Sequence, residues 1–517
     1  MKLTSFIKNT SILAIKYGDR QYVHYILKIF VIKTIHYLLA RGVKAKQRIV
    51  LVTDHDDVSL LLIFAASAIG FEVVMPYNLN RACQDEWSTI ISDMRPVTII
   101  FSKNDPDLLK QLSLVHSHII PINFDLINNE VVSSQHDYLS KQAPIKHFFI
   151  LYTSGTTGKP KAISMSEAAI IKQVLKVSKK LKFTAASRIF MSGLMNNTTG
   201  IIFSFGAIAH ECTLIYPQSR DINTWPAQVA QDKVTHLMLR PASLETFLHV
   251  VEQEHVTLPT LKVLAYGAAL LPRHVLHKGR SLLACDWIQG YGLSETFGPF
   301  CWLTENDHRN NLPARYTYCI GRSDDTFDIA IRPLNTKNPR EGELLIRGPG
   351  LMQGYYDVQS NQVIPHDGWY ATGDYVEIMD DHYIALKGRI STTVLTQNGH
   401  QVNPQEVELV VQDAGFADEA LLLNYNNSQL SDTYGAILCL HLRKTSSLDG
   451  IKQSLLKTIQ KHLSREKWPD YMYVSQEPFP RNDNNKIIRN RVQEMISPQH
   501  VIKLFNLEDR HHVSRTI

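Results

Sequence analysis

Short apolar runs alternate with longer amphipathic segments along most of the chain. Several runs are apolar throughout, which is typical of parallel strands that are covered on both faces. Amphipathic helices are expected between them, for example over 166–181 and 243–255. The pattern predicts an α/β architecture with crossover helices. The predicted strands are 48–54, 71–77, 97–102, 118–124, 147–154, 235–240 and 261–267.

The pattern changes after about residue 315. The stretches "FDIAIRP", "GELLIRG", "WYATGDYVEIM" and "HYIALKGR" alternate apolar and polar positions, which predicts antiparallel strands. A small α/β unit is expected next, with a helix at 403–414, strands near 418–424 and 434–442, and a helix at 451–463.

The domain boundary is expected near "LKGRIS" at 386–391. The predicted division is a large domain at 1–388, a small domain at 389–500 and a polar tail at 501–517.

Composition and charge narrow the function classes. At 517 residues the chain is too long for one hydrophobic core, so two or more domains are expected. Lys and Arg outnumber Asp and Glu by 54 to 49, an excess too small to favour nucleic-acid binding. The six cysteines are scattered and lack the spacing of zinc ligands, so we expect no disulfide framework and a protein that resides in the reducing cytoplasm. The charge-free stretch 58–71 is shorter than a membrane span, so it predicts a buried helix and no membrane insertion.

The glycine-rich stretch "LYTSGTTGKPKAI" (151–163) is suited to phosphate. Backbone N–H groups of such a turn, with hydroxyl and ammonium groups, can cradle phosphate oxygens. It is not a Walker A loop, because Thr153 stands where a glycine is required and Pro160 follows Lys159. Pro160 also prevents a helix from starting there. The sequence predicts a phosphate-binding strap between a strand and a later helix; the alternative is an exposed hinge loop.

The stretch "YTSGTTGKPK" resembles the signature loop of the adenylate-forming (AMP-binding) superfamily. That superfamily includes acyl-CoA synthetases, aryl-acid ligases, peptide-synthetase adenylation domains and firefly luciferase. The resemblance covers roughly residues 10–495. Five further stretches resemble later motifs of the family, in its order and at about its spacing: 289–298, 342–356, 369–378, 386–390 and 479–489.

The resemblance implies a fold and a reaction. The fold is α/β, with a large N-terminal domain of mixed, mostly parallel sheets, a distorted antiparallel barrel-like part, and a small mobile C-terminal α+β domain. In the reaction a carboxylic acid attacks the α-phosphate of ATP, and pyrophosphate leaves. The acyl group then forms a thioester with CoA or with the phosphopantetheine of a carrier protein. The implied cofactors are ATP and Mg²⁺, and the implied partner is a small carboxylic acid.

The resemblance also implies roles for individual residues. Tyr291, followed by Gly292, would stack on adenine, and Ser294 would bind the α-phosphate. Glu295 would be the Mg²⁺ ligand; outside this motif it would be interpreted as a solvated charge. The residues expected to close over the β- and γ-phosphates, with Lys161 as an anchor, are Thr153, Ser154, Gly155, Thr156, Thr157, Gly158 and Lys159.

Further roles follow for the ribose and the carboxylate. Asp374 would accept both ribose hydroxyls, and Arg389 would help to hold the ribose. Lys486 would bridge the carboxylate and the α-phosphate. Gly267 and Ala268 would line the adenine slot and the acid pocket, where they permit close backbone approach.

The chain departs from the family pattern at the hinge and near the catalytic lysine. Ser391 and Thr392 stand where most relatives carry an acidic pair, the first of which is the pivot of domain rotation. Asn485 stands where glycine is usual, although asparagine tolerates left-handed backbone angles. The hinge departure bears on the thioester step and leaves the adenylation residues intact.

The segment 190–208 resembles the part of the family that lines the acid pocket. Asn196 or Asn197 stands where enzymes for α-amino acids usually place an aspartate. A buried ammonium group without a carboxylate is costly, so an acid without an α-amino group is favoured. The alternative is that the asparagines only cap a helix.

Three hypotheses remain from the sequence. The first is a ligase that joins an acid to a thiol through an acyl-AMP. The second is an adenylation enzyme that loads an amino acid onto a separate carrier protein. The third is a degenerate nucleotide-binding scaffold, which the unusual Ser391 and Asn485 favour and the intact Lys486, Glu295 and Asp374 oppose.

Overall fold

The computed structural model describes the chain from Met1 to Phe505, apart from short segments. The residues that it does not describe are 55, 77–83, 104, 133–143, 154–160, 310–318, 335–337, 358, 361, 366–367, 398–399, 416, 428–432, 443–447, 482–486 and 506–517.

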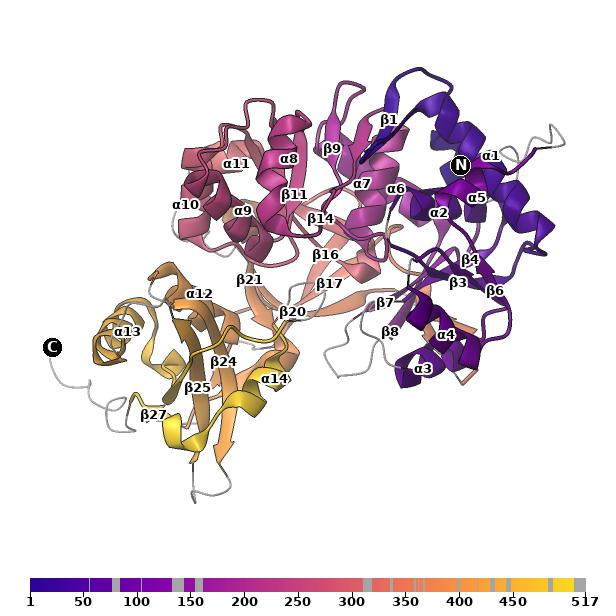
Figure 1. The fold of residues 1–517 in the computed structure, drawn as a ribbon. Coiled ribbons are helices and arrows are strands. Elements are labelled where there is room, and N and C mark those ends of the chain that lie inside the picture. Colours follow the sequence, from indigo (N-terminus) through magenta and orange to yellow (C-terminus); the bar gives the residue numbers. More distant parts are fainter. Residues whose placement is uncertain are drawn as a thin grey trace, which may run out of the picture.

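The larger part of the molecule is built on two extended sheets (Figure 1). The first sheet has a parallel half, in which β13, β12, β11, β9, β10 and β1 run in the same direction, and an antiparallel half. The antiparallel strands predicted after residue 315 therefore continue the parallel sheet. In order, the strands are β16 Asp328–Pro333, β17 Glu341–Arg347, β20 Tyr370–Ile378, β21 Ile384–Arg389, β15 Cys319–Ser323, β14 Gly298–Leu303, β13 Asp286–Leu293, β12 Val263–Gly267, β11 His236–Leu239, β9 Arg188–Phe190, β10 Thr213–Ile215, β1 Leu13–Tyr17 and β2 Arg20–Val23.

The second sheet carries the glycine-rich loop. Its order is β19 Gln362–Pro365, β18 Gly354–Asp357, β8 Lys161–Met165, β7 Phe149–Thr153, β4 Glu72–Met75, β3 Arg48–Val52, β5 Thr98–Phe101 and β6 Ile119–Pro121. Strands β7 and β8 are antiparallel, with Thr153 opposite Lys161. The later helix of the prediction is α6 (Glu167–Lys180), and β8, which was not predicted, lies between the loop and that helix. A proline at residue 160 is compatible with this position just before a strand.

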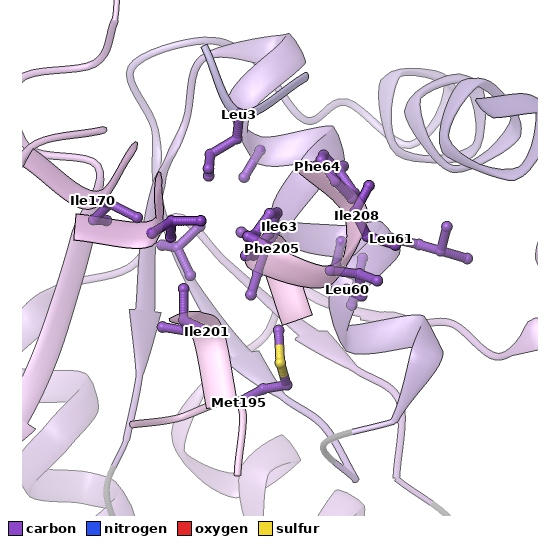
Figure 2. Close-up of a cluster of buried hydrophobic side chains, with 14 of the residues drawn as sticks. Leu3, Leu60, Leu61, Ile63, Phe64, Ile170, Met195, Ile201, Phe205 and Ile208 are labelled. Atoms are coloured by element: carbon purple, nitrogen blue, oxygen red, sulfur yellow. The ribbon is translucent and has the colours of Figure 1, made fainter. Parts of the chain in front are cut away.

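Three helices, α2, α6 and α7, pack in one hydrophobic cluster with strands of both sheets. The stretch predicted as a buried helix forms α2 (Asp57–Ile69), and all of its residues are buried. Figure 2 shows Leu60, Leu61, Ile63 and Phe64 of α2 beside Phe205 and Ile208 of α7. The other helices of this part are α1 His24–Ala40, α3 Gln84–Met94, α4 Pro106–Val115, α5 Phe124–Asn128, α6 Glu167–Lys180, α7 Thr198–Ala209, α8 Trp225–Gln231, α9 Pro241–Gln253, α10 Arg273–Leu282 and α11 Glu305–Arg309. Across the described residues, no helix combines the length and hydropathy needed to span a membrane.

The C-terminal part has its own sheet and its own hydrophobic clusters (Figure 1). Its predicted helix, two strands and second helix are all present. The helices are α12 Pro404–Asp413, α13 Leu448–His462 and α14 Arg489–Met495. The main sheet is β24 Ala417–Asn427, β25 Thr433–Leu442, β26 Tyr471–Ser475 and β27 Ile502–Lys503, and a small pair is β22 Val394–Leu395 with β23 Gln401–Val402.

The predicted polar tail begins too early. Residues 502–503 form β27, which pairs with β26. Leu504 and Phe505 are buried, and the Phe505 ring lies 4.5 Å from the Trp468 ring. The prediction of a tail from residue 501 is therefore wrong for 501–505, because the apolar side chains of this segment complete the C-terminal core.

The C-terminal part contacts the larger part through α12. Leu409 packs in one cluster with Leu270, Val376 and Ile384. At the end of α12, Asp413 Oδ1 accepts a hydrogen bond from the backbone N–H of Arg273 at 2.8 Å. Pro272 at the N-cap of α10 provides no capping side chain, so a carboxylate from a distant helix satisfies this end of α10.

His274 adds a pH-dependent contribution to this contact. Its ring nitrogens lie 3.5 Å from Asp413 Oδ1 and 3.8 Å from Glu245 Oε1. The neighbouring carboxylates of Asp413 and Glu245 raise the pKa of His274 to about 9. Protonated His274 therefore stabilises the folded chain fully below its ordinary pKa of about 6.5, and this stabilisation is lost as pH rises through 9.

We expect the melting temperature of His274→Asn to fall below that of the wild type at pH 6 and to approach it at pH 10. Thermal unfolding across this range measures the difference, with His277→Asn, an exposed histidine on the same helix, as the control. A difference between His274→Asn and the wild type that does not change with pH would contradict this role.

Candidate active site

Glycines lie near the carboxyl ends of β12 and β13, where they leave the backbone of this edge of the sheet without side chains. Gly267 and Gly290 are direct partners in these parallel strands. A Cβ atom at residue 267 would lie 2.2 Å from the Gly290 carbonyl oxygen, so only glycine fits. Ala268 follows with a φ of +67°, a left-handed conformation that is uncommon outside glycine and often marks a functional site. Ligands of α/β sheets usually bind at this end of the strands.

Three residues that were predicted separately meet beside this edge. Tyr291 of β13 donates a hydrogen bond to Asp374 Oδ2 at 2.5 Å, and Arg389 Nε lies 2.8 Å from Asp374 Oδ1. Asp374 and Arg389 are opposite each other in β20 and β21. Arg389 also donates to the Thr372 carbonyl at 2.6 Å, and the Tyr291 ring packs edge-on against Phe300. The Asp374 carboxylate is thus fixed from two sides.

This arrangement suits the binding of a sugar. A carboxylate has about four acceptor positions, so it can accept hydrogen bonds from protein donors and from hydroxyl groups of a ligand together. Burial and the charge of Asp374 raise the pKa of Tyr291, so its hydroxyl stays protonated and donates. Asp374 itself is 3% exposed, so it is held in a defined place.

Glu295 lies in a tight turn directly after β13. The turn is a single 3₁₀ element, η3 (Ser294–Thr296), and Phe297 ends it with a left-handed φ of +49°. The buried Thr296 hydroxyl donates to the Gly298 carbonyl at 2.7 Å and accepts from the Leu293 N–H at 2.9 Å. These local bonds fix the backbone that carries Ser294 and Glu295.

The Glu295 side chain meets two tyrosines. Tyr355 of β18 donates to Glu295 Oε1 at 3.0 Å, and the hydroxyls of Tyr355 and Tyr370 are 2.9 Å apart. Burial, together with the charge of Glu295, raises the pKa of Tyr355 to about 12 and also raises that of Tyr370. Both hydroxyls therefore stay protonated at neutral pH.

The two clusters share their supporting elements. Tyr291 and Glu295 follow one another on β13 and η3, while Tyr370 and Asp374 lie on β20. The segment β13–η3 and strand β20 therefore position both carboxylates, Asp374 beside Tyr291 and Glu295 beside Tyr370. Because these supports are strands of one sheet, the distance between the clusters is constrained.

Glu295 fits a Mg²⁺ ion that arrives with a nucleotide. Among the described residues, no group of three or more His, Cys, Asp or Glu side chains is arranged to hold a metal. Mg²⁺ typically uses one or two protein carboxylates and takes its other ligands from substrate phosphates and water. A single oriented carboxylate beside a predicted phosphate loop matches that donor set.

The base of the glycine-rich loop lies next to Tyr355. Lys161 Nζ is 5.2 Å from the centre of the Tyr355 ring, in a cation–π contact. The side chain of Thr153 and the whole of Ser154, Gly155, Thr156, Thr157, Gly158 and Lys159 lie outside the described residues, so their roles stay predictions.

Lys486 also lies outside the described residues, but described residues on both sides of it are anchored. Arg481 and Ile487 form an antiparallel bridge. Arg481 Nε lies 3.1 Å from Glu419 Oε1, and the Phe479 N–H donates to Glu419 Oε2 at 2.6 Å. The residues that flank the segment with Lys486 are therefore held in place by other residues.

The two asparagines of the predicted acid pocket have different environments. Asn197 is the N-cap of α7, and its Oδ1 accepts from the Gly200 N–H at 3.0 Å. Asn196 is buried, and its amide donates to the Pro76 carbonyl at 3.3 Å. The capping alternative therefore holds for Asn197, while a pocket role for Asn196 stays a prediction.

Neither Tyr355 nor Tyr370 is among the site residues predicted from the sequence. Both lie inside stretches that carry the family resemblance, 342–356 and 369–378. A polar aromatic residue inside such a motif is a usable signal, but the partner, Glu295, lies on a different element and cannot be identified from spacing.

Comparison with known proteins relates the chain to a family. The family model described as "AMP-binding enzyme" matches residues 14–356. A long-chain-fatty-acid–CoA ligase of Mycobacterium tuberculosis is 23% identical over 472 residues, covering 89% of this chain and 90% of that protein. An indoleacetate–CoA ligase of Aromatoleum aromaticum is 25% identical over 371 residues, covering 68% of each chain.

Solved structures agree in fold. The o-succinylbenzoate–CoA synthetase of Bacillus subtilis, in complex with ATP and magnesium ion, matches with a TM-score of 0.80 at 19% identity, covering 95% of this chain and 98% of that one. An anthranilate–CoA ligase in complex with anthranoyl-AMP matches with a TM-score of 0.82 at 17% identity, covering 96% and 97%. With the family model matching well over half of its length, the chain belongs to the AMP-binding enzyme family.

Proposed function

We propose that the protein activates a carboxylic acid with ATP and transfers the acyl group to a thiol. The acid attacks the α-phosphate, the bond to the β-phosphate breaks, and pyrophosphate leaves with its electron pair. The thiol then attacks the acyl carbon of the acyl-AMP, forms a thioester and releases AMP. The observation that carries this proposal is the meeting of Tyr291, Asp374 and Arg389 beside the turn that bears Glu295.

Each part of that geometry has a task in the reaction. Asp374 and Arg389 hold the ribose, so the α-phosphate is fixed relative to the sheet edge at Gly267. Glu295 takes the cation that accompanies the phosphates, and Ser294 contacts the α-phosphate from the same turn. Lys486 and the glycine-rich loop supply positive charge and N–H donors where negative charge develops on the phosphate oxygens.

We propose that the acid has no α-amino group and that CoA is the acceptor. Asn196 offers a buried amide rather than a carboxylate, and a buried ammonium without a carboxylate is costly. The relatives named above act on a fatty acid and on indoleacetate with CoA. These names support an apolar or aromatic acid; a carrier-protein thiol is the alternative acceptor.

Thioester formation tests the acid and the acceptor together. The protein is incubated with ATP, Mg²⁺, CoA and one of three acid classes: fatty acids, aromatic acids or α-amino acids. We expect acyl-CoA, detected by mass spectrometry, with an acid of the first two classes. Thioester or acyl-AMP with α-amino acids alone would contradict the proposed acid class, and acyl-AMP that never passes to CoA would contradict the proposed acceptor.

A further inference from the structure

Two tyrosines from different sheets hold the carboxylate of Glu295. Tyr355 donates to Glu295 Oε1 at 3.0 Å, and its oxygen lies 2.9 Å from the Tyr370 oxygen. A phenol has one proton, and Tyr355 gives its proton to Glu295. Tyr370 has a side-chain hydrogen bond with Glu295 as well as its contact with Tyr355, so both phenols act on the same carboxylate.

Both tyrosines are fixed by strand pairing. Tyr355 is opposite Ile163 in the β18–β8 pair of the second sheet, and Tyr370 is opposite Ile346 in the β20–β17 pair of the first sheet. The backbone of Glu295 is also fixed, because its carbonyl accepts from the Met352 N–H at 2.7 Å. Glu295 thus bridges the two sheets.

We propose that Tyr355 and Tyr370 are positioning residues that orient Glu295 toward the divalent cation of a bound nucleotide. The inference rests on the proposed function, because it takes Glu295 as the carboxylate that binds this cation. A glutamate side chain has several rotatable bonds, and it loses that freedom when it binds a metal. Hydrogen bonds that fix it beforehand reduce this loss and tighten cation binding.

Tyr355 also contacts the base of the glycine-rich loop. Its ring lies under Lys161 Nζ at 5.2 Å, and Lys161 is opposite Thr153 where the loop leaves the hairpin. The ring therefore supports the loop, while the hydroxyl supports Glu295. Replacement by phenylalanine separates the two roles, because it keeps the ring and removes only the hydroxyl.

The test measures ATP binding as a function of Mg²⁺ concentration, by calorimetry, for Tyr355→Phe and Tyr370→Phe. We expect the Mg²⁺ concentration for half-maximal tightening of ATP binding to rise about tenfold in Tyr355→Phe and less in Tyr370→Phe. ATP binding without Mg²⁺ should stay within about twofold of the wild type. Tyr375→Phe is the matched control, because Tyr375 lies on the same strand and donates to the Glu341 carboxylate at 2.9 Å.

Glu295→Gln separates failure of this inference from failure of the proposed function. If Glu295→Gln raises the Mg²⁺ requirement and neither tyrosine variant does, the positioning role is wrong and the proposed function stands. If Glu295→Gln leaves the requirement unchanged, Glu295 does not bind the cation, and both this inference and the cation-binding role given to Glu295 are wrong, whereas the proposed reaction is tested separately by pyrophosphate exchange. Melting temperatures close to the wild type show that the variants compared are folded.

Discussion

Lys486→Ala is expected to lose acyl-adenylate formation by about 100- to 1000-fold, the loss typical when a group that stabilises transition-state charge is removed. The carboxylate and the phosphate are both anionic, so a cation between them offsets their repulsion during attack. The residues before Lys486 are held by contacts of Arg481 and Phe479 with Glu419. The fold should therefore survive the substitution.

Pyrophosphate exchange and melting temperature, measured together, check this result for Lys486. Lys503→Ala is the control, because Lys503 is an exposed lysine on β27 of the same C-terminal part. Exchange by a folded Lys486→Ala protein within threefold of the wild type would show that the assignment of Lys486 is wrong.

Asp374→Ala is expected to weaken ATP binding by at least about 100-fold. A hydrogen bond to a charged group contributes about 1.5–3 kcal/mol, and this carboxylate is proposed to accept two from the ribose. The substitution also leaves Arg389 and Tyr291 without this partner. Because the Arg389 side chain is 40% exposed, water can solvate its charge, and the protein should remain folded with a lower melting temperature.

Calorimetric titration with ATP measures this effect. Asp328→Ala is the control, because it removes an exposed aspartate that pairs with Arg347 at 2.9 Å on neighbouring strands, and exposed pairs contribute little to stability. The ribose role of Asp374 would be refuted by an Asp374→Ala protein that is folded and binds ATP as tightly as the Asp328→Ala control.

The sequence predicted local elements well because their patterns are local. The apolar run in α2 and the alternation in β16 and β17 each lie within one element, so periodicity identifies them. Long-range pairing has no such signal. The missed strand β1 pairs with β10, about 200 residues away, and the predicted tail closes the C-terminal core because Phe505 packs on Trp468.

In the site, too, single residues could be predicted from the sequence and contacts between distant residues could not. Motif resemblance identified Tyr291, Asp374 and Arg389 one at a time, and the structure brings them into contact. The support of Glu295 by Tyr355 depends on how β18 lies against the turn after β13, which sequence spacing does not encode. Resemblance could not separate Asn196 from Asn197, because they are adjacent in the sequence. A shift of one residue in the start of α7 determines which of the two side chains caps the helix.

The measurement that tests the central claim most directly is exchange of labelled pyrophosphate into ATP with no thiol present. Reversible formation of acyl-AMP predicts exchange that requires both Mg²⁺ and an acid, and that stops when either is omitted. A protein that binds ATP but shows no exchange with any fatty, aromatic or amino acid would contradict the claim, as would release of ADP and phosphate in place of AMP and pyrophosphate.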